Sequence, residues 1–186
     1  LIARLLLSLR KAGGEVRVNA RLKELVRDEH EIVGAIVEFD GKPVRIRARK
    51  GVVLATGGFA SSATWRNKVL PQVRIENVLT FKGANGEGID AALAVGADLD
   101  SDHESPFFWM PASIINWSKD DRAIFPHIRD RPKPGLIAVD QMGHRFVNEA
   151  NSYHDFVSAM LNHPSGPITT AHLICDRAFV HNYGLG

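Results

Sequence analysis

The stretch KGVVLATGGFA, residues 50–60, is the feature that most constrains what this chain can fold into. Its apolar run is unbroken and ends at the paired glycines Gly57 and Gly58. Such a run, bounded by glycines, is typical of a strand that is buried on both faces of a parallel sheet. We therefore predict a buried parallel strand here, followed by a turn with no side chain beside the backbone. A pyrophosphate or a flavin could approach such a turn closely, although a plain strand-to-loop turn explains the same glycines.

The residues before this run predict a helix and a small antiparallel meander. Leucines at helical spacing within residues 1–9, closed by Gly13 and Gly14, indicate an amphipathic helix. Alternating stretches follow, and Asp40 with Gly41 gives a strong signal for a hairpin turn between two of them. The strands are expected within residues 15–26, 31–39 and 44–48.

The stretch GANGEGIDAALAVGADL, residues 83–99, predicts a loop that passes into a helix from about Gly88 to Val95, closed by Gly96. The free N–H groups at the start of such a helix favour anions. A structural turn explains the same glycines without any ligand. The spacing matches neither GxGxxG nor GxxxxGK[ST], so hydrolysis of nucleoside triphosphates is not supported.

The second half of the chain begins with an irregular segment. Residues 101–136 are rich in proline and tryptophan, which indicates irregular structure and a domain boundary. After it, residues 135–140 and 144–149 predict a hairpin that turns at Met142 and Gly143. A helix within residues 153–162 and a last strand within residues 171–176 complete the prediction.

The stretch RFVNEANSYHDF, residues 145–156, mixes titratable and apolar side chains. Tyr153 can transfer a proton only if its neighbours shift its pKa or share its proton. His154 is adjacent in sequence, but neighbours on a helix point about 100° apart, so adjacency does not make them a pair. Asn151 or Ser152 as a helix N-cap explains part of the pattern without catalysis, and the residues alone leave both interpretations open.

The charge and residue composition of the chain indicate which classes of partner to expect. A formal net charge of +2, without a block of basic residues, predicts neither nucleic acid nor an anionic membrane as a partner. Arg4 interrupts the first apolar run, which is too short to span a bilayer. The single cysteine, Cys175, suits a reducing compartment, so we expect a cytoplasmic protein. The nine-residue spacing of His154, His163 and His172 gives no standard ligand pair, and no metal site is predicted.

Taken in order, the quoted stretches resemble the superfamily of FAD-dependent fumarate reductases, succinate dehydrogenases and 3-ketosteroid Δ1-dehydrogenases. The resemblance rests on GGEVRVNARLKEL, on the run ending in ATGGFA, on GANGEGIDAALAVGADL and on GHRFVNEANSYHDF. It implies an α/β (α+β) fold. Residues 1–105 would form part of a Rossmann-like FAD-binding domain with an antiparallel meander, and residues 106–186 part of a substrate-binding cap. The superfamily's N-terminal GxGxxG segment and its C-terminal FAD-binding segment are not matched, so we expect an internal piece of a larger protein.

The resemblance also implies site residues. In such proteins the backbone of the first strand meets the adenine, and the two glycine-rich segments run past the cofactor. Four residues after the Glu of the R-F-x-N-E motif, fumarate reductases place an arginine that donates a proton, whereas ketosteroid dehydrogenases have a tyrosine. Here that residue is Tyr153, with His154 and Arg145 as candidates to tune or position it. The implied FAD contacts are Arg21, Leu22, Ala55, Thr56, Gly57, Gly58, Asn85, Gly86, Glu87 and Glu149.

The resemblance predicts a flavoprotein that transfers hydride between a ketone of the 3-ketosteroid kind and FAD, with a tyrosine as proton acceptor or donor. Two alternatives stand beside it. One is a dicarboxylate enzyme of the fumarate reductase type. Against it, the upstream Glu-x-x-Arg proton route of fumarate reductases is not matched, since the nearest matching stretch reads IRDRPKPG. The other is a non-catalytic interaction scaffold that folds only beside other segments. We expect the 186-residue chain alone to retain little FAD and to be inactive.

Overall fold

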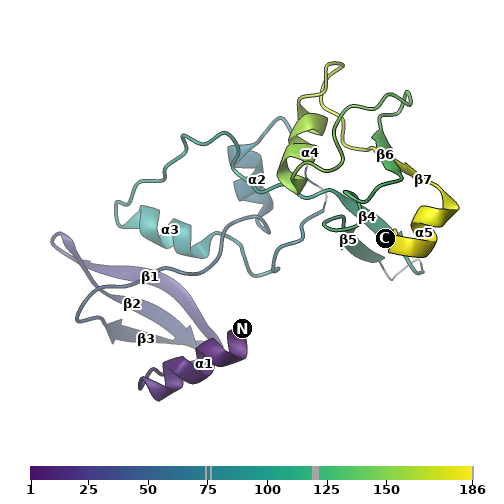
Figure 1. The fold of residues 1–186 in the computed structure, drawn as a ribbon. Coiled ribbons are helices and arrows are strands. Elements are labelled where there is room, and N and C mark those ends of the chain that lie inside the picture. The colour runs from purple at the N-terminus through teal and green to yellow at the C-terminus, as the bar shows by residue number, and fades with distance from the viewer. Residues whose placement is uncertain (74, 76, 119–121, 186) are drawn as a thin grey trace. The chain divides into compact units, whose positions relative to one another are not determined.

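The computed structural model describes residues 1–73, 75, 77–118 and 122–185. These residues form two compact units (Figure 1). Unit 1 comprises Leu1–Arg74 with Thr80–Asp102, and unit 2 comprises Ile75–Leu79 with His103–Gly186. The predicted assignment of the two parts, a cofactor domain and a substrate cap, stays a prediction because compactness does not identify what a unit binds.

Unit 1 opens with the predicted helix and meander. Helix α1 (Ile2–Lys11) precedes an antiparallel sheet in the order β1 (Ala20–Asp28), β2 (Glu31–Phe39) and β3 (Lys42–Arg47). The turn between β2 and β3 has positive φ at both central residues, 47° at Asp40 and 78° at Gly41. This is the backbone that a two-residue hairpin of type I′ requires, and it confirms the predicted turn.

Two helices complete unit 1. Helix α2 (Ala63–Val69), which the sequence did not predict, begins at Ser62, whose side chain accepts a hydrogen bond from the Trp65 amide. Helix α3 (Glu87–Ala94) lies within one residue of its predicted bounds and packs against β1. The core of the unit is built from Leu25, Ala35 and Ala91.

The buried parallel strand predicted within residues 50–60 is wrong. These residues run without regular secondary structure, and the Val53 side chain is 90% exposed. A strand of this kind is buried only when strands pair on both sides of it, and no strand of the described residues pairs with it. Of the residues in this run, only Val52 packs against the core of unit 1.

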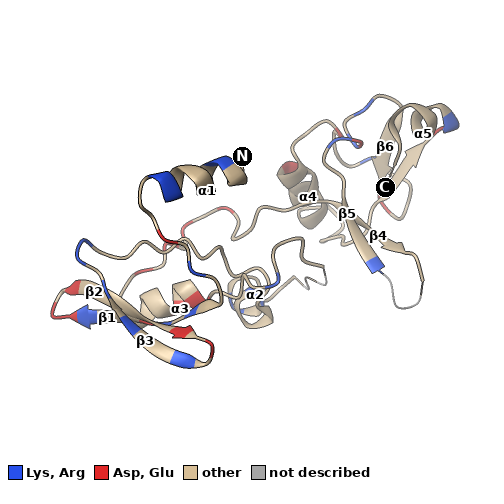
Figure 2. Ribbon diagram, turned by 90° about the horizontal axis from the view of Figure 1, so that it is seen from below, with Lys and Arg blue, Asp and Glu red and all other residues tan. Residues whose placement is uncertain are grey.

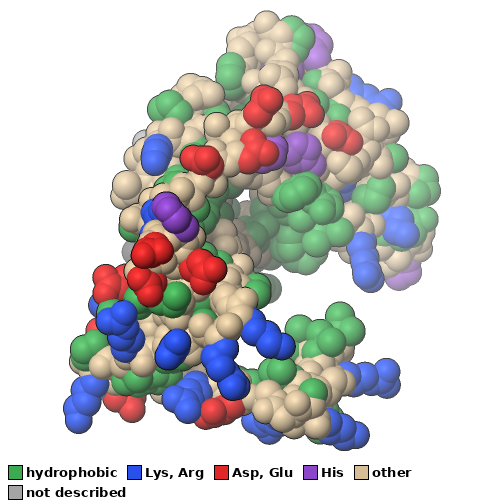
Figure 3. All heavy atoms as spheres, turned by 90° about the vertical axis from the view of Figure 1, so that its left-hand side faces the viewer, with side chains coloured by type: hydrophobic (Ala, Val, Ile, Leu, Met, Phe, Trp, Pro, Cys, Tyr) green, Lys and Arg blue, Asp and Glu red, His purple; other side chains and the backbone are tan. Residues whose placement is uncertain are grey.

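The charges of unit 1 are mixed in sign. Basic residues lie on α1, and both signs occur along the three-stranded sheet (Figure 2). In the space-filling view both signs are interspersed over the face of unit 1 that it shows (Figure 3). Some form surface pairs, such as Lys23 with Glu38 at 3.2 Å, and pairs this exposed add little to stability.

The described residues of unit 2 form two two-stranded antiparallel sheets and two helices. Strands β4 (Ala112–Asn116) and β5 (Arg122–Pro126) pair with each other, as do β6 (Leu136–Val139) and β7 (His172–Cys175). The helices are α4 (Tyr153–Leu161) and α5 (Arg177–Tyr183). Ala138, Phe156 and Met160 form the buried core. The mixture of helices and small antiparallel sheets confirms the predicted fold class, and α4 and β7 lie where they were predicted.

Two predictions for unit 2 are wrong. The stretch expected to be irregular contains the β4–β5 hairpin, because its prolines Pro111 and Pro126 lie beside or at the ends of the strands, where a missing N–H costs little. Residues 144–149 do not form a strand with β6. Only Arg145 bridges to Val139, and β7 pairs with β6 instead. The turn at Met142 and Gly143 is present.

Candidate functional site

The two glycine-rich loops of unit 1, residues 56–61 and 83–88, are joined by backbone hydrogen bonds. The Gly86 amide donates to the Gly58 carbonyl at 3.2 Å, and the Ser61 amide donates to the Ala84 carbonyl at 3.0 Å. The Ser61 hydroxyl also donates to the Phe81 carbonyl. The structure thus brings together two of the segments that the sequence assigned to a cofactor.

Two of these glycines are required by packing. A Cβ atom built on Gly88 would overlap the Thr56 hydroxyl oxygen. One built on Gly86 would lie 2.7 Å from the Trp65 ring, and Gly86 also has a φ of 85°. The Trp65 indole is itself fixed by a hydrogen bond to Asp90 at 3.2 Å. Close contact between the loops and α2 therefore explains Gly86 and Gly88 without a ligand.

Gly57 and Gly58 are different, because space is open beside them. Gly57 has a φ of 79°, and a Cβ there would meet only the Ala84 methyl group, at 3.9 Å. A Cβ on Gly58 would meet no atom of the described residues within 4 Å. Packing within unit 1 does not need these glycines to be small, and the backbone is open to a bound group.

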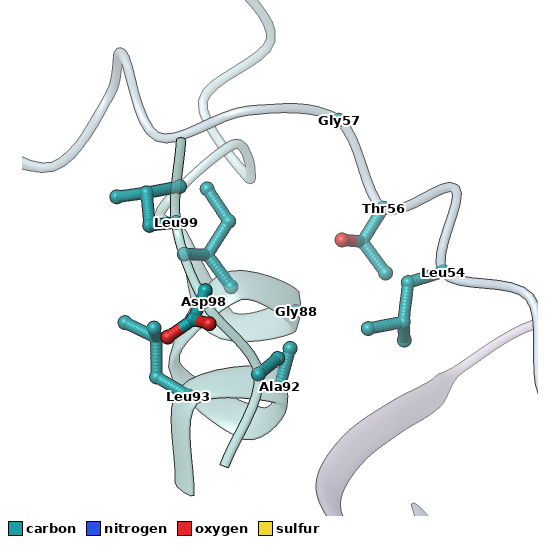
Figure 4. A pocket seen from close by; sticks show the side chains of 10 residues that line it. Leu54, Thr56, Gly57, Gly88, Ala92, Leu93, Asp98 and Leu99 are labelled. Carbon is teal, nitrogen blue, oxygen red and sulfur yellow. The ribbon is translucent and has the colours of Figure 1, made fainter. Parts of the chain in front are cut away.

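A cavity of about 180 Å³ lies between this loop and α3. Leu54 and Thr56 extend toward the helix from one side, and Ala92 and Leu93 belong to the other (Figure 4). Asp98 is the one carboxylate among its lining residues. Sites for drug-sized ligands measure roughly 300–1,000 Å³, so this cavity can hold only part of a dinucleotide.

Arg21 links β1 to the second glycine-rich loop. Its Nη2 lies 2.5 Å from Glu87 Oε1 at the start of α3, and this hydrogen bond raises the pKa of Arg21. Leu22 packs against the core of the unit. Arg21 and the loop of residues 85–87 are therefore neighbours, whereas the Ala55 and Asn85 side chains are exposed.

In unit 2, Tyr153 is the first residue of α4 and its side chain is 37% exposed. The preceding Ser152 caps the helix and accepts a hydrogen bond from the Asp155 amide at 3.1 Å. The capping role that the sequence proposed for this stretch is therefore present. Ser152 performs this role, so the Tyr153 hydroxyl is not used to cap the helix.

Arg145 and Glu149 form a bidentate pair. The Arg145 Nε lies 3.0 Å from Glu149 Oε1, and its Nη2 lies 2.6 Å from Oε2. The Ala138 amide also donates to Oε1 at 2.8 Å. Burial alone would raise the pKa of Glu149, but the hydrogen bonds from Arg145 and Ala138 outweigh it and lower that pKa. The structure shows Arg145 held by Glu149.

His154 fixes the segment that carries the aromatic residues 107–109. Its Nδ1 accepts a hydrogen bond from the Trp109 amide at 3.2 Å, which assigns the proton of the neutral ring to Nε2. The Phe108 ring packs edge-on against the imidazole with a centroid distance of 5.8 Å. His154 therefore joins the start of α4 to this aromatic segment.

Sequence reasoning missed a buried polar cluster in the same unit. His127 is 3% exposed and lies 2.6 Å from both Ser113 Oγ and Asp130 Oδ2. Arg131 is 2% exposed and bonds to backbone carbonyls just before Tyr153. Each residue stands in a stretch that reads as irregular, so no spacing signal marked them. Within the described part of the chain, no group of three or more side chains is arranged to hold a metal ion, and no helix is long and apolar enough to cross a membrane.

Comparisons with known proteins identify the relatives of the chain. The model of the FAD binding domain family matches residues 1–183. A 4-oxocyclohex-2-ene-1-carboxylate 5-dehydrogenase from Sinomonas cyclohexanicum is 34% identical over 178 residues, covering 94% of this chain and 30% of that enzyme. The chain spans about a third of the length of the curated relatives it matches.

Two solved structures have the same fold. The 3-ketosteroid Δ1-dehydrogenase from Sterolibacterium denitrificans, in complex with 1,4-androstadiene-3,17-dione, matches with a TM-score of 0.81 and 28% identity, covering 96% of this chain and 32% of that one. The open conformation of a flavocytochrome c3 fumarate reductase matches with a TM-score of 0.63 and 27% identity, covering 97% and 30%. These matches confirm the resemblance inferred from the sequence.

Proposed function

The chain belongs to the FAD binding domain family, and we propose that it is the middle part of a flavoprotein oxidoreductase that acts on a cyclic ketone. The observation that carries the proposal is the higher structural similarity to a ketosteroid dehydrogenase than to a fumarate reductase. Tyr153 supports it, because a tyrosine stands where the resemblance puts the arginine of fumarate reductases. The dehydrogenase from Sinomonas also has a cyclic ketone in its name.

The residues of unit 1 fit part of an FAD molecule. The open space beside Gly57 and Gly58 admits a phosphate or ribose against the backbone, as close approach of a cofactor demands. We propose that residues 55–58 run past the ADP part, that residues 85–87 lie near the cofactor, and that the backbone of Arg21 and Leu22 meets the adenine. The contact predicted for Glu149 stays a prediction. When bound, FAD supplies the hydride-accepting chemistry that side chains lack.

The proposed role of unit 2 is proton transfer. As a hydride leaves one carbon of the ketone, a proton leaves the adjacent carbon, and the two electrons of that C–H bond form the new C=C bond. Tyr153 accepts that proton on its phenolic oxygen, or donates it in the reverse direction. His154 and Arg145 would act through position, since each is already bound to another part of the unit.

The test is to purify the full-length protein, measure bound FAD by absorbance, and assay a panel of 3-ketosteroids, small cyclic ketones and fumarate. We expect one FAD per chain and turnover of a ketone. Turnover of fumarate with no activity on any ketone would replace this function with dicarboxylate reduction. A full-length protein without flavin would favour an interaction scaffold. The expected cytoplasmic location stays a prediction.

A further inference from the structure

We propose that Arg131 positions Tyr153 for proton transfer, an inference that rests on the proposed function. Arg131 follows β5 in the chain and is 2% exposed, although its side chain carries a charge. A buried charge costs free energy, and replacing a buried ionic group by a well-packed apolar one is often neutral for stability. Packing alone therefore does not require an arginine here.

The guanidinium binds the segment that leads into α4. Its Nη1 donates to the Glu149 carbonyl, and its Nη2 donates to the Asn151 carbonyl at 2.8 Å. These carbonyls stand on either side of Ala150, immediately before the helix cap at Ser152. Because the guanidinium is planar, two parallel donors fix the direction of both carbonyls at once.

A second set of contacts fixes Arg131 itself. Its Nε donates to the His127 carbonyl at 3.4 Å, and its guanidinium carbon lies 4.9 Å from the centroid of the Phe156 ring. Phe156 is on α4 and is 1% exposed. Arg131 therefore contacts both the segment before α4 and the buried face of that helix, so that the helix start cannot shift without breaking one of them.

The residues around Arg131 keep its loop in place. Asp130 bonds to His127, and His127 bonds to Ser113 on β4, each at 2.6 Å. Burial lowers the pKa of Arg131, while the charges of Asp130 and Glu149 raise it. The Arg131 side chain thus connects the loop after β5 to the segment that ends two residues before Tyr153.

The position of Tyr153 matters for the proposed proton transfer. A displacement of about 1 Å can cost roughly 100-fold in rate when a reacting group must be aligned. Lysine at position 131 retains the charge but loses the planar fork, so it tests alignment without removing the cation. We expect Arg131→Lys in the FAD-loaded full-length protein to lower kcat by about 10- to 100-fold, with KM and FAD occupancy unchanged.

The decisive experiment is a double-mutant cycle with Tyr153→Phe. If Arg131 acts through Tyr153, adding Arg131→Lys to Tyr153→Phe lowers kcat by less than about twofold more, because residues that act as a unit are not additive. The pH profile gives a second readout: the limb that disappears in Tyr153→Phe should shift in Arg131→Lys. Arg129→Lys, at an exposed position in the same loop, is the matched control and should leave kcat unchanged.

Several outcomes would overturn the inference. Unchanged kcat in Arg131→Lys, or losses that multiply in the double variant, would leave Arg131 without a role in positioning. If Arg131→Lys does not fold, kcat of Arg131→Ala should recover more with added guanidinium ion than with added methylammonium. Equal recovery would show that the planar pair of donors is not what positions Tyr153. If neither variant folds, the role is purely structural. Full activity of Tyr153→Phe would instead remove the proposed function itself.

Discussion

The amide of Gly86 donates a hydrogen bond to the carbonyl of Gly58 at 3.2 Å, and this bond makes one structural element of two loops that are distant in sequence. Gly86 begins α3, and Gly58 ends the run that the sequence marks most strongly. The proposed FAD site uses both loops, and substitutions in these loops are expected to separate cofactor binding from folding.

Gly57→Val should lower FAD occupancy in the full-length protein more than it lowers the melting temperature. The branched side chain would fill the open space in which we propose the phosphates of FAD pass, and it also strains a residue with a φ of 79°. The matched control is Gly41→Val, at a φ of 78° with open space around it, in the hairpin turn. Equal FAD occupancy in the two variants, measured by absorbance ratio, would show that strain alone is being observed.

Gly88→Ala should destabilise unit 1, although alanine is the better helix former by about 1 kcal/mol. The added methyl group would overlap the Thr56 side chain, and overpacking of this kind costs typically ~1–3 kcal/mol. Adding Thr56→Ala removes the hydroxyl and one methyl group and should restore part of the loss. Chemical denaturation of the full-length protein measures both variants, and no recovery in the double variant would contradict the contact.

Tyr153→Phe should lower kcat by about 10²–10⁴-fold while FAD binding stays intact, since only the hydroxyl is lost. Tyr183→Phe, at a 45% exposed tyrosine on α5, controls for loss of a phenol elsewhere in unit 2. Tyr153→Arg is not expected to create fumarate reduction, because the stretch that matches the Glu-x-x-Arg segment of fumarate reductases reads IRDRPKPG and lacks that motif. Steady-state kinetics on ketones and on fumarate checks all three variants, and a fumarate reductase activity in Tyr153→Arg would favour the dicarboxylate alternative.

The stability of unit 2 should depend on the ionisation of Asp140. The hydrogen bond from the His144 amide lowers the pKa of this carboxyl more than burial raises it, and the Met142 amide lowers it further. His144 Nδ1 and His163 Nε2 also face Oδ2, at 3.6 and 3.4 Å. Because the folded pKa lies below the unfolded value of about 3.9, the stabilisation is complete above that pH and is lost as the pH falls through the folded pKa.

The measurement is the melting temperature between about pH 2 and pH 7. Asp140→Asn retains the oxygen that accepts both amides but loses the charge, so it should melt lower than the parent protein at pH 7 and depend less on pH below 4. Asp28→Asn, at an exposed position at the end of β1, is the control. Identical pH dependence in the parent and Asp140→Asn would assign the acid sensitivity to other groups.

Local signals in the sequence were sufficient to predict the elements that depend on contacts between residues close in sequence. The turn at Asp40 and Gly41 follows from the two residues that tolerate positive φ. Helix α3 has Gly86 as its N-cap, and Gly96 follows its C-cap, Val95. The same holds for α4, which Ser152 caps. Each of these elements is decided by residues within a few positions of one another.

The elements that were missed depend on distant partners. The run around Val53 has the composition of a buried strand, yet burial requires neighbours that the described residues do not supply. Strand β6 pairs with β7 and not with the residues just after it. Within unit 1 the meeting of Gly58 with Gly86, and within unit 2 the burial of Arg131, both depend on long-range contacts. The resemblance named Tyr153 and the glycines, but nothing in the sequence indicated which side chain holds the start of α4.

The pairing of Leu136 with Cys175 in the β6–β7 sheet has a kinetic consequence. The strands of the β1–β3 meander are joined by short turns, whereas β6 and β7 are separated in the chain by α4 and its flanking loops. Closing a longer loop costs more chain entropy. We expect this sheet to form last during folding and to open first under mild denaturant. Cys175 is the single cysteine of the chain and stands on β7. Its thiol is half-buried in the folded sheet, so an increase in its rate of reaction with a thiol reagent under mild denaturant measures how often that sheet opens.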